Sequence, residues 1–160
     1  MVKVHITPKD AELRVERAVQ LFKEGYNCSQ SVVGAFADLY GFTQEQALLM
    51  SASFGGGIGR MRQTCGAACG MFVLAGLQSG TTIGSDREGK SRNYAMVQQL
   101  AESFKQINGS IICAELLGLK PNAEITAQAS ERTDSYYKKR PCSEMVRTAA
   151  RLFANAISQD

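Results

Sequence analysis

The sequence contains almost no histidine and little net charge, and each shortage excludes a class of function. Only one of the 160 residues is a histidine, His5. A Ser–His–Asp or Cys–His hydrolase, or a zinc finger with histidine ligands, would depend on that single side chain near the N-terminus. With 18 Lys and Arg against 15 Asp and Glu, the net charge of +3 is too small to indicate a protein that binds nucleic acid or a membrane surface.

Long hydrophobic runs, proline and a secretion signal are also lacking. The most apolar stretch, residues 65–77, is shorter than the roughly 20 residues that a membrane-spanning helix needs. The first ten residues contain no apolar core of a signal peptide. Only 3 Pro and 15 Gly, with 44% hydrophobic residues, exclude collagen-like and disordered chains. The sequence therefore predicts one cytoplasmic domain over residues 1–160, with residues 1–8 as a flexible leader.

What the sequence does contain is a succession of helical patterns. Apolar residues recur at helical spacing, and no stretch alternates convincingly with the period of two that marks a half-buried strand. Thr, Asn, Ser and Pro stand where helices begin, and glycines stand where they end. We predict an all-α, compact bundle of about six to seven helices. The expected helices span residues 8–24, 28–40, 65–79, 111–117 and 142–157, with a short one after Thr43 and a long one from Ser85 to about residue 107.

A glycine-rich loop precedes the most apolar of these helices. Four of the five residues 55–59 are glycine, and because each glycine costs a helix about 1 kcal/mol relative to alanine, this segment is expected to be a loop. It lacks the Gly-Lys-Ser/Thr and G-x-G-x-x-G phosphate-binding patterns. Successive glycine N–H groups can nevertheless hold an anion. The candidate cofactor-binding residues are therefore Gly55, Gly56, Gly57 and Gly59, while a tight turn between packed helices explains them at least as well.

Five cysteines carry most of the chemistry in this sequence. Four of them fall in the first turn of four different expected helices, namely Cys28, Cys65, Cys113 and Cys142. Backbone N–H groups are unpaired there and the helix dipole is positive, which favours thiolates or an anionic cluster. In a cytoplasmic chain such cysteines indicate a metal site or redox chemistry more often than structural disulfides. We therefore predict that these four share one site and that Cys69, one turn after Cys65, lies outside it.

Five separated segments form a combination that is specific to one family: residues 26–32 (YNCSQSV), 54–59 (FGGGIG), 65–70 (CGAACG), 109–118 (GSIICAELLG) and 140–142 (RPC). Together they resemble the C_GCAxxG_C_C family of small bacterial and archaeal proteins, to which redox activity is ascribed. The resemblance implies that the family's four cysteines correspond to Cys28, Cys65, Cys113 and Cys142, whereas Cys69 occupies a variable position. The family is similar to the cluster-bearing part of split-Soret cytochromes, but this chain has no C-x-x-C-H haem-attachment motif.

The same four thiols are compatible with three functions. The leading hypothesis is an iron–sulfur cluster, of the [2Fe–2S] type, that serves electron transfer or redox sensing with these cysteines as ligands. The second is an oxidoreductase acting on disulfides or peroxides, with Cys65 as the nucleophile because the helix start, Arg60 and Arg62 favour its thiolate. The third is a structural zinc site with four cysteine ligands. We expect the protein to interact with a redox partner protein and to bind neither nucleic acid nor a membrane. The sequence is also compatible with a homodimer.

Overall fold

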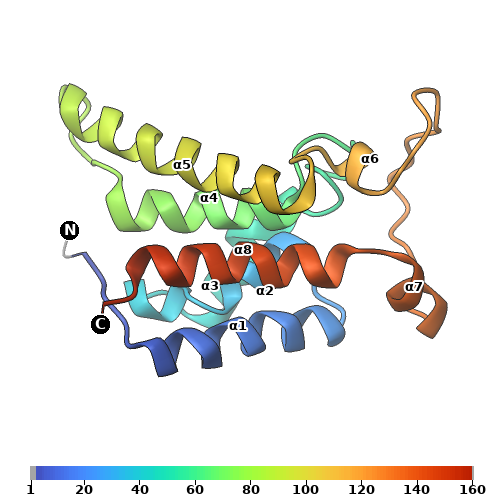
Figure 1. Ribbon diagram of the computed structural model, residues 1–160, viewed down its shortest axis with the longest axis horizontal. Coiled ribbons are helices and arrows are strands. Elements are labelled where there is room, and N and C mark those ends of the chain that lie inside the picture. The colour runs from blue at the N-terminus through green and yellow to red at the C-terminus, as the bar shows by residue number, and fades with distance from the viewer. Residues whose placement is uncertain (1–2, 160) are drawn as a thin grey trace.

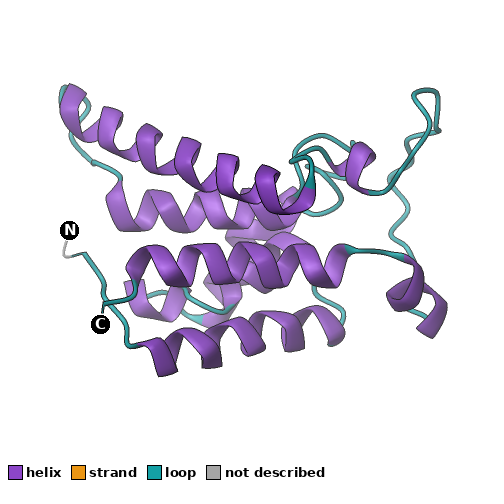
Figure 2. Ribbon diagram, viewed as in Figure 1, coloured by secondary structure: helices purple, strands orange, loops and turns teal. Residues whose placement is uncertain are grey.

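The computed structural model describes residues 3–159 and forms a layered bundle of helices (Figures 1 and 2). The all-α prediction is confirmed, since these residues contain eight α-helices, two 3-10 helices and no strand. The long helices run side by side along the molecule: α1 (Pro8–Lys23), α4 (Gly66–Ser79), α5 (Arg87–Asn108) and α8 (Cys142–Ile157). The shorter elements are α2 (Cys28–Gly34), η1 (Ala37–Tyr40), α3 (Gln44–Ser51), η2 (Ala52–Phe54), α6 (Cys113–Leu116) and α7 (Asp134–Lys139).

The central helix is α4, as its uniformly apolar sequence predicts. It packs against α2, α5 and α8, and most of its first two turns is buried. A Cβ atom at Gly70 would lie only 3.0 Å from the carbonyl oxygen of Ser29 and from Cβ of Val32, so the small residue permits α2 to approach closely. None of the helices within residues 3–159 is long and apolar enough to cross a lipid bilayer.

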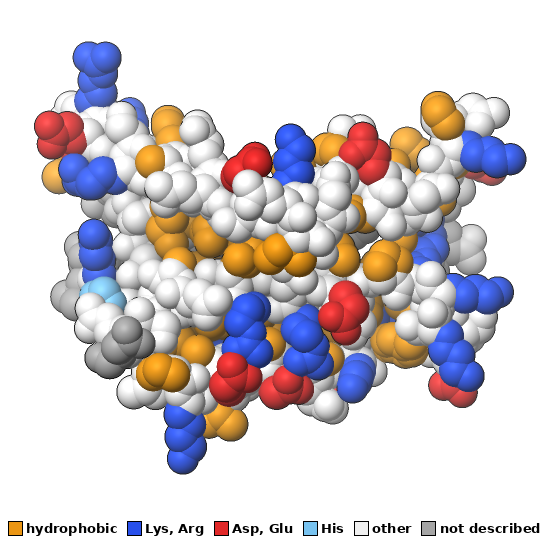
Figure 3. Space-filling model, in the orientation of Figure 1, with side chains coloured by type: hydrophobic (Ala, Val, Ile, Leu, Met, Phe, Trp, Pro, Cys, Tyr) orange, Lys and Arg blue, Asp and Glu red, His pale blue; other side chains and the backbone are white. Residues whose placement is uncertain are grey.

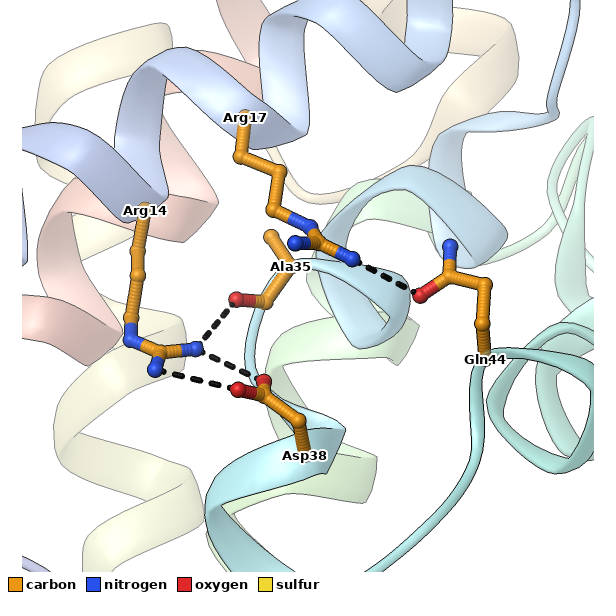
Figure 4. A network of polar contacts seen from close by, with 5 residues as sticks. All are labelled: Arg14, Arg17, Ala35, Asp38 and Gln44. Carbon is orange, nitrogen blue, oxygen red and sulfur yellow. Dashed lines mark hydrogen bonds and ion pairs between the residues drawn. The ribbon is translucent and has the colours of Figure 1, made fainter.

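The helix expected over residues 28–40 is interrupted, and a half-buried arginine side chain from α1 binds at the break. The α-helix ends at Gly34, and Ala37–Tyr40 forms a separate 3-10 helix. Arg14 on α1 donates a hydrogen bond to the Ala35 carbonyl oxygen (2.9 Å) and pairs with the Asp38 carboxylate (2.7 Å; Figure 4). The carbonyl that would continue the helix is thus taken by a side chain from another element.

Two helix starts also differ from the prediction. The N-cap of α5 is Asp86 rather than Ser85, because the Asp86 carboxylate accepts a hydrogen bond from the N–H of Gly89 (2.8 Å). The helix expected over residues 111–117 shortens to α6, because Ser110 and the residues after it enter an extended pairing with another segment.

The two ends of the chain meet at the end of the bundle opposite α6 and α7 (Figure 1). The N–H of Ile6 donates to the carbonyl oxygen of Ile157, and the N–H of Gln159 donates to that of Ile6, both at 3.0 Å. Val4 exchanges two hydrogen bonds with the side chain of Gln78. Most of the predicted leader is thereby attached to the bundle, while its residues 1 and 2 lie outside the described residues.

The outer surface of α1 and α8 is polar, whereas the surface between α8 and α5 is hydrophobic (Figure 3). Ion pairs join the two helices through Arg147 with Glu16 (2.5 Å) and Arg151 with Glu12. Figure 3 shows acidic and basic side chains meeting over this lower part of the molecule and a band of hydrophobic side chains between α5 and α8. These ion pairs border the apolar contacts between α1 and α8, and α8 presents its first residue to the site described next.

Candidate functional site

A cavity of about 480 Å³ lies at the end of the bundle that carries α6 and α7, and all four predicted cysteines line it. Its volume falls in the roughly 300–1,000 Å³ range of small-molecule sites. Cys65 and Cys113 are buried, whereas Cys28 and Cys142 are half-buried. Cys69 is buried without lining the cavity, and its thiol lies 3.7 Å from the carbonyl oxygen of Thr64. The structure thus brings together the four cysteines that the sequence selects and leaves Cys69 outside.

Cys28 is positioned by the capping of α2. Asn27 and Gln30 form a capping box, in which each side chain accepts a hydrogen bond from the backbone N–H of the other residue. The Asn27 side chain also donates to the carbonyl oxygen of Ala52 (2.9 Å), and that of Gln30 donates to the carbonyl oxygen of Leu48 (3.1 Å). The start of α2 is therefore attached to the segment that leads into the glycine loop, and Cys28 is its first residue.

Cys65 and Cys113 are brought together by a short antiparallel pairing. Thr64 forms an isolated bridge with Ile112, the N–H of Cys65 donates to Ile111 (2.7 Å), and the N–H of Cys113 donates to Gln63 (2.6 Å). This pairing aligns the starts of α4 and α6. It also shifts the predicted cap, because Thr64 is used in the bridge and Cys65 itself is the N-cap residue of α4.

The glycine loop is shaped mainly by close packing. A Cβ atom at Gly57 would lie 2.6 Å from Cβ of Cys113, and one at Gly55 would lie 2.5 Å from Cγ of Asn27. All four candidate glycines line the cavity. However, the N–H groups of residues 58–63, including that of Gly59, already donate to carbonyl oxygens of residues 53–58. A role of these glycines in holding a cofactor stays a prediction, and it rests on the amides of residues 55–57.

The charged residues around the cavity are all of one sign. Its lining includes four arginines and neither aspartate nor glutamate: Arg60, Arg62, Arg132 and Arg140. Arg62 donates toward the sulfur of Cys113 (3.7 Å), and Arg60 donates to Thr126 (2.9 Å to its hydroxyl) and Ser130 (2.8 Å). The cavity therefore favours anionic groups, thiolates among them.

Cys142, the first residue of α8, is the acidic thiol of the site. A hydrogen bond from the Cys28 thiol lowers the pKa of Cys142 to about 7, helped by the Arg140 charge and by a hydrogen bond from the Tyr136 hydroxyl, while burial opposes the shift. The same contact raises the pKa of Cys28, because it stabilises the protonated thiol that donates the hydrogen bond. Of the two, Cys142 therefore ionises first, and Cys28 stays protonated as its hydrogen-bond donor.

The expectation that Cys65 is the activated thiol is not met by its surroundings. Burial raises the pKa of Cys65 to about 12, and the N–H groups of Ala68 and Ala67 at the start of α4 offset this only in part. Burial also raises the pKa of Cys113, although Arg62 opposes it. Desolvation thus outweighs the helix-start effect at the two buried cysteines, and the lowered pKa belongs to Cys142 instead.

Arg132 and Tyr136 belong to this site, although the sequence patterns do not single them out. Arg132 donates to the carbonyl oxygens of Phe22 (3.0 Å) and Tyr26 (2.9 Å) at the end of α1. Its guanidinium also lies 4.9 Å from the ring centre of Tyr136, the residue whose hydroxyl reaches Cys142. No short-range signal marks either residue, because Arg132 precedes Thr133, the N-cap of α7, and acts through contacts at the end of α1 that no local pattern contains.

The thiols are free, and their present arrangement does not surround a single ion. None of the five cysteines forms a disulfide. Within residues 3–159, no group of three or more His, Cys, Asp or Glu side chains is arranged to hold one metal ion.

Comparison with known proteins gives the same assignment as the motifs. An uncharacterized protein of Archaeoglobus fulgidus is 27% identical over 158 residues, which cover 93% of this chain and 96% of that protein. No solved structure matches the chain. The sequence model of the family described as "Putative redox-active protein (C_GCAxxG_C_C)" matches residues 26–156. The chain belongs to the C_GCAxxG_C_C family.

Proposed function

We propose that this protein is a redox protein whose four cavity cysteines bind an iron–sulfur cluster. The observation that carries the proposal is the convergence of Cys28, Cys65, Cys113 and Cys142 on one cavity that contains four arginines and no carboxylate. Four cysteine thiolates are the ligand set of [2Fe–2S] and [4Fe–4S] clusters. A bound cluster would supply one-electron transfer.

A cluster accepts more widely separated thiols than a single zinc ion does. Four cysteines around one zinc place every sulfur about 2.3 Å from a common point. Within residues 3–159 no such group exists, whereas a cluster distributes its ligands over more than one iron atom and needs a wider cavity. We therefore propose a cluster rather than a zinc ion.

The chain's own residues would compensate the charge of such a centre. Four thiolates with a cluster are a net anion, and burial makes a lone anion costly. Arg62 already donates toward the sulfur of Cys113, and Tyr136 and Arg140 lie against Cys142. Hydrogen bonds and positive charge around ligand sulfurs are the means by which proteins raise the potential of a centre.

Anaerobic purification with a visible spectrum and analysis of iron, zinc and acid-labile sulfide tests the proposal. We expect iron and sulfide in equal amounts, and because the chain has no Trp, cluster bands should stand out against its absorbance. Serine at any of the four cavity cysteines should abolish them, whereas the matched variant Cys69→Ser should retain them. Stoichiometric zinc without sulfide, or equal loss of iron in Cys69→Ser, would refute it.

The hydrogen bond between Cys28 and Cys142 favours a second candidate function, thiol–disulfide exchange. The Cys142 thiolate would attack one sulfur of a substrate disulfide and release the other as a thiolate. Cys28, after losing its proton, would then attack Cys142 in the mixed disulfide and release the second thiol. The substrate is reduced to two thiols and the pair is oxidised to a disulfide, so the electrons balance.

Redox titration against a glutathione or dithiothreitol series distinguishes this candidate from the cluster. Mass spectrometry after proteolysis should find Cys28 linked to Cys142 in the metal-free protein, and Cys65→Ser should leave that link unchanged. Activity that is lost in Cys65→Ser but kept in Cys142→Ser would contradict it.

A further inference from the structure

The four arginines of the cavity do not all have the same freedom to bind a ligand. The guanidinium of Arg132 is committed to two carbonyl oxygens of the protein, and that of Arg60 to Thr126 and Ser130. Arg62 uses one N–H group toward the sulfur of Cys113. Arg140 stacks on the ring of Tyr136, 5.0 Å from its centre, and makes no side-chain hydrogen bond to any residue within 3–159. Arg62 and Arg140 are therefore the two with donors to spare.

These arginines also repel one another. Burial, together with the positive charges of Arg62 and Arg140, lowers the pKa of Arg60. No acidic side chain lines the cavity to relieve this repulsion. An anion bound beside Arg60, Arg62 and Arg140 would relieve it.

The apolar part of the cavity lining indicates that the ligand also has an apolar part. Apolar side chains contribute to the wall from α6, from the loop before α7 and from α8: Leu116, Leu117, Ala127, Ala129, Pro141 and Met145. A small inorganic ion would leave this apolar surface unused. An organic molecule with an anionic head and an apolar body would match both parts.

We propose that this cavity binds an organic oxyanion, a carboxylate or phosphate with an apolar body, through the guanidinium groups of Arg62 and Arg140. Guanidinium donors are arranged as a fork that matches two oxygens of such a group. The ligand would lie beside the Cys28–Cys142 pair, which places an anionic compound next to the redox-active thiols. The inference depends on the cavity lining, and a bound cluster would share Arg62 and Arg140 with the ligand.

Isothermal titration calorimetry at low ionic strength tests the proposal with hexanoate and hexyl phosphate as probes. The titrations use the full-length protein as purified, and iron and sulfide are measured on the same samples, so that failure of the cluster and failure of anion binding are read separately. We expect saturable binding of at least one probe, weaker binding of acetate and none of the neutral hexanamide.

We expect Arg140→Gln and Arg62→Gln each to weaken binding roughly tenfold or more, because each variant loses a hydrogen bond to a charged group. Lys138→Gln is the matched control, because it removes the same charge from an exposed residue of α7 that does not line the cavity, and it should leave binding about unchanged. Thermal melts verify that each variant is folded. No saturable binding, equal binding of hexanamide, or equal loss in Lys138→Gln would overturn the proposal.

Discussion

Replacing Cys28 by alanine is a direct test of how the acidic thiol is produced. The Cys28 thiol is the largest single cause of the lowered pKa of Cys142, ahead of Arg140 and Tyr136. Alanine removes the donor and leaves the arginines in place. The substitution therefore separates the contribution of one hydrogen bond from that of the surrounding positive charge.

The size of the effect follows from the strength of a charged hydrogen bond. Such a bond contributes about 1.5–3 kcal/mol, and one pH unit corresponds to about 1.4 kcal/mol, so the pKa of Cys142 should rise by about one to two pH units in Cys28→Ala. Starting from about 7, it would return to the ordinary range of a cysteine. At neutral pH the thiolate fraction of Cys142 would then fall about fivefold to fiftyfold. Alkylation at this thiol would slow less, by several-fold to tenfold, because a more basic thiolate is more nucleophilic.

The measurement is the rate of iodoacetamide alkylation of Cys142 against pH, followed by peptide mass spectrometry in reduced, metal-free protein. Cys69→Ala is the control, because Cys69 is buried outside the cavity, so its removal should leave the pH profile of Cys142 unchanged. A wild-type pKa at or above the ordinary value of about 8.5 would refute the reasoning, as would the same pKa in Cys28→Ala and the wild type.

Three further predictions concern packing, pH and the missed residues. Gly57→Ala should destabilise the fold by about 2 kcal/mol or more in urea denaturation, because its left-handed backbone adds about 1–2 kcal/mol to a clash with Cys113 at 2.6 Å. Alkaline pH should also lower stability in urea denaturation: the folded pKa of Cys65 is raised to about 12, so the stability it contributes is present below the ordinary cysteine pKa and is lost as the pH rises toward 12. Arg132→Ala should raise the pKa of Cys142, measured by the same alkylation profile, because it removes both a nearby positive charge and the contacts that hold α7 on α1.

Each of these has its own control. Gly109 has a similar left-handed backbone, and a Cβ added there would have no atom within 4 Å, so Gly109→Ala should cost only the backbone strain. An equal loss in both glycine variants would show that the clash with Cys113 is unimportant. Cys65→Ala should flatten the alkaline part of the stability profile; an unchanged profile would assign it to other groups. Arg132→Lys keeps the charge but not the fork of donors, so a pKa of Cys142 equal to that of Arg132→Ala would show that geometry matters more than charge.

The local pattern of the sequence was sufficient for most helices and for the choice of cysteines. Thr7 with Pro8, the Thr43–Gln46 capping box and the Pro141–Cys142 start are short-range signals, and α1, α3 and α8 begin where they indicate. Whereas the long-range Thr64–Ile112 pairing sets the starts of α4 and α6, short-range signals of the same kind place Cys28 and Cys142 at the first residues of α2 and α8. These features depend on neighbours within one turn, which is why they can be derived from the sequence alone.

What only the tertiary structure decided is the electrostatic character of each thiol. Helix starts and nearby arginines favour Cys65 in the sequence, but burial of Cys65 outweighs them and burial is a property of the packed fold. Cys142 becomes acidic because Cys28, far away along the chain, reaches it across the cavity and because Arg132 holds Tyr136 beside it. A pKa depends on desolvation and on charges close in space, and neither can be derived from spacing along the sequence.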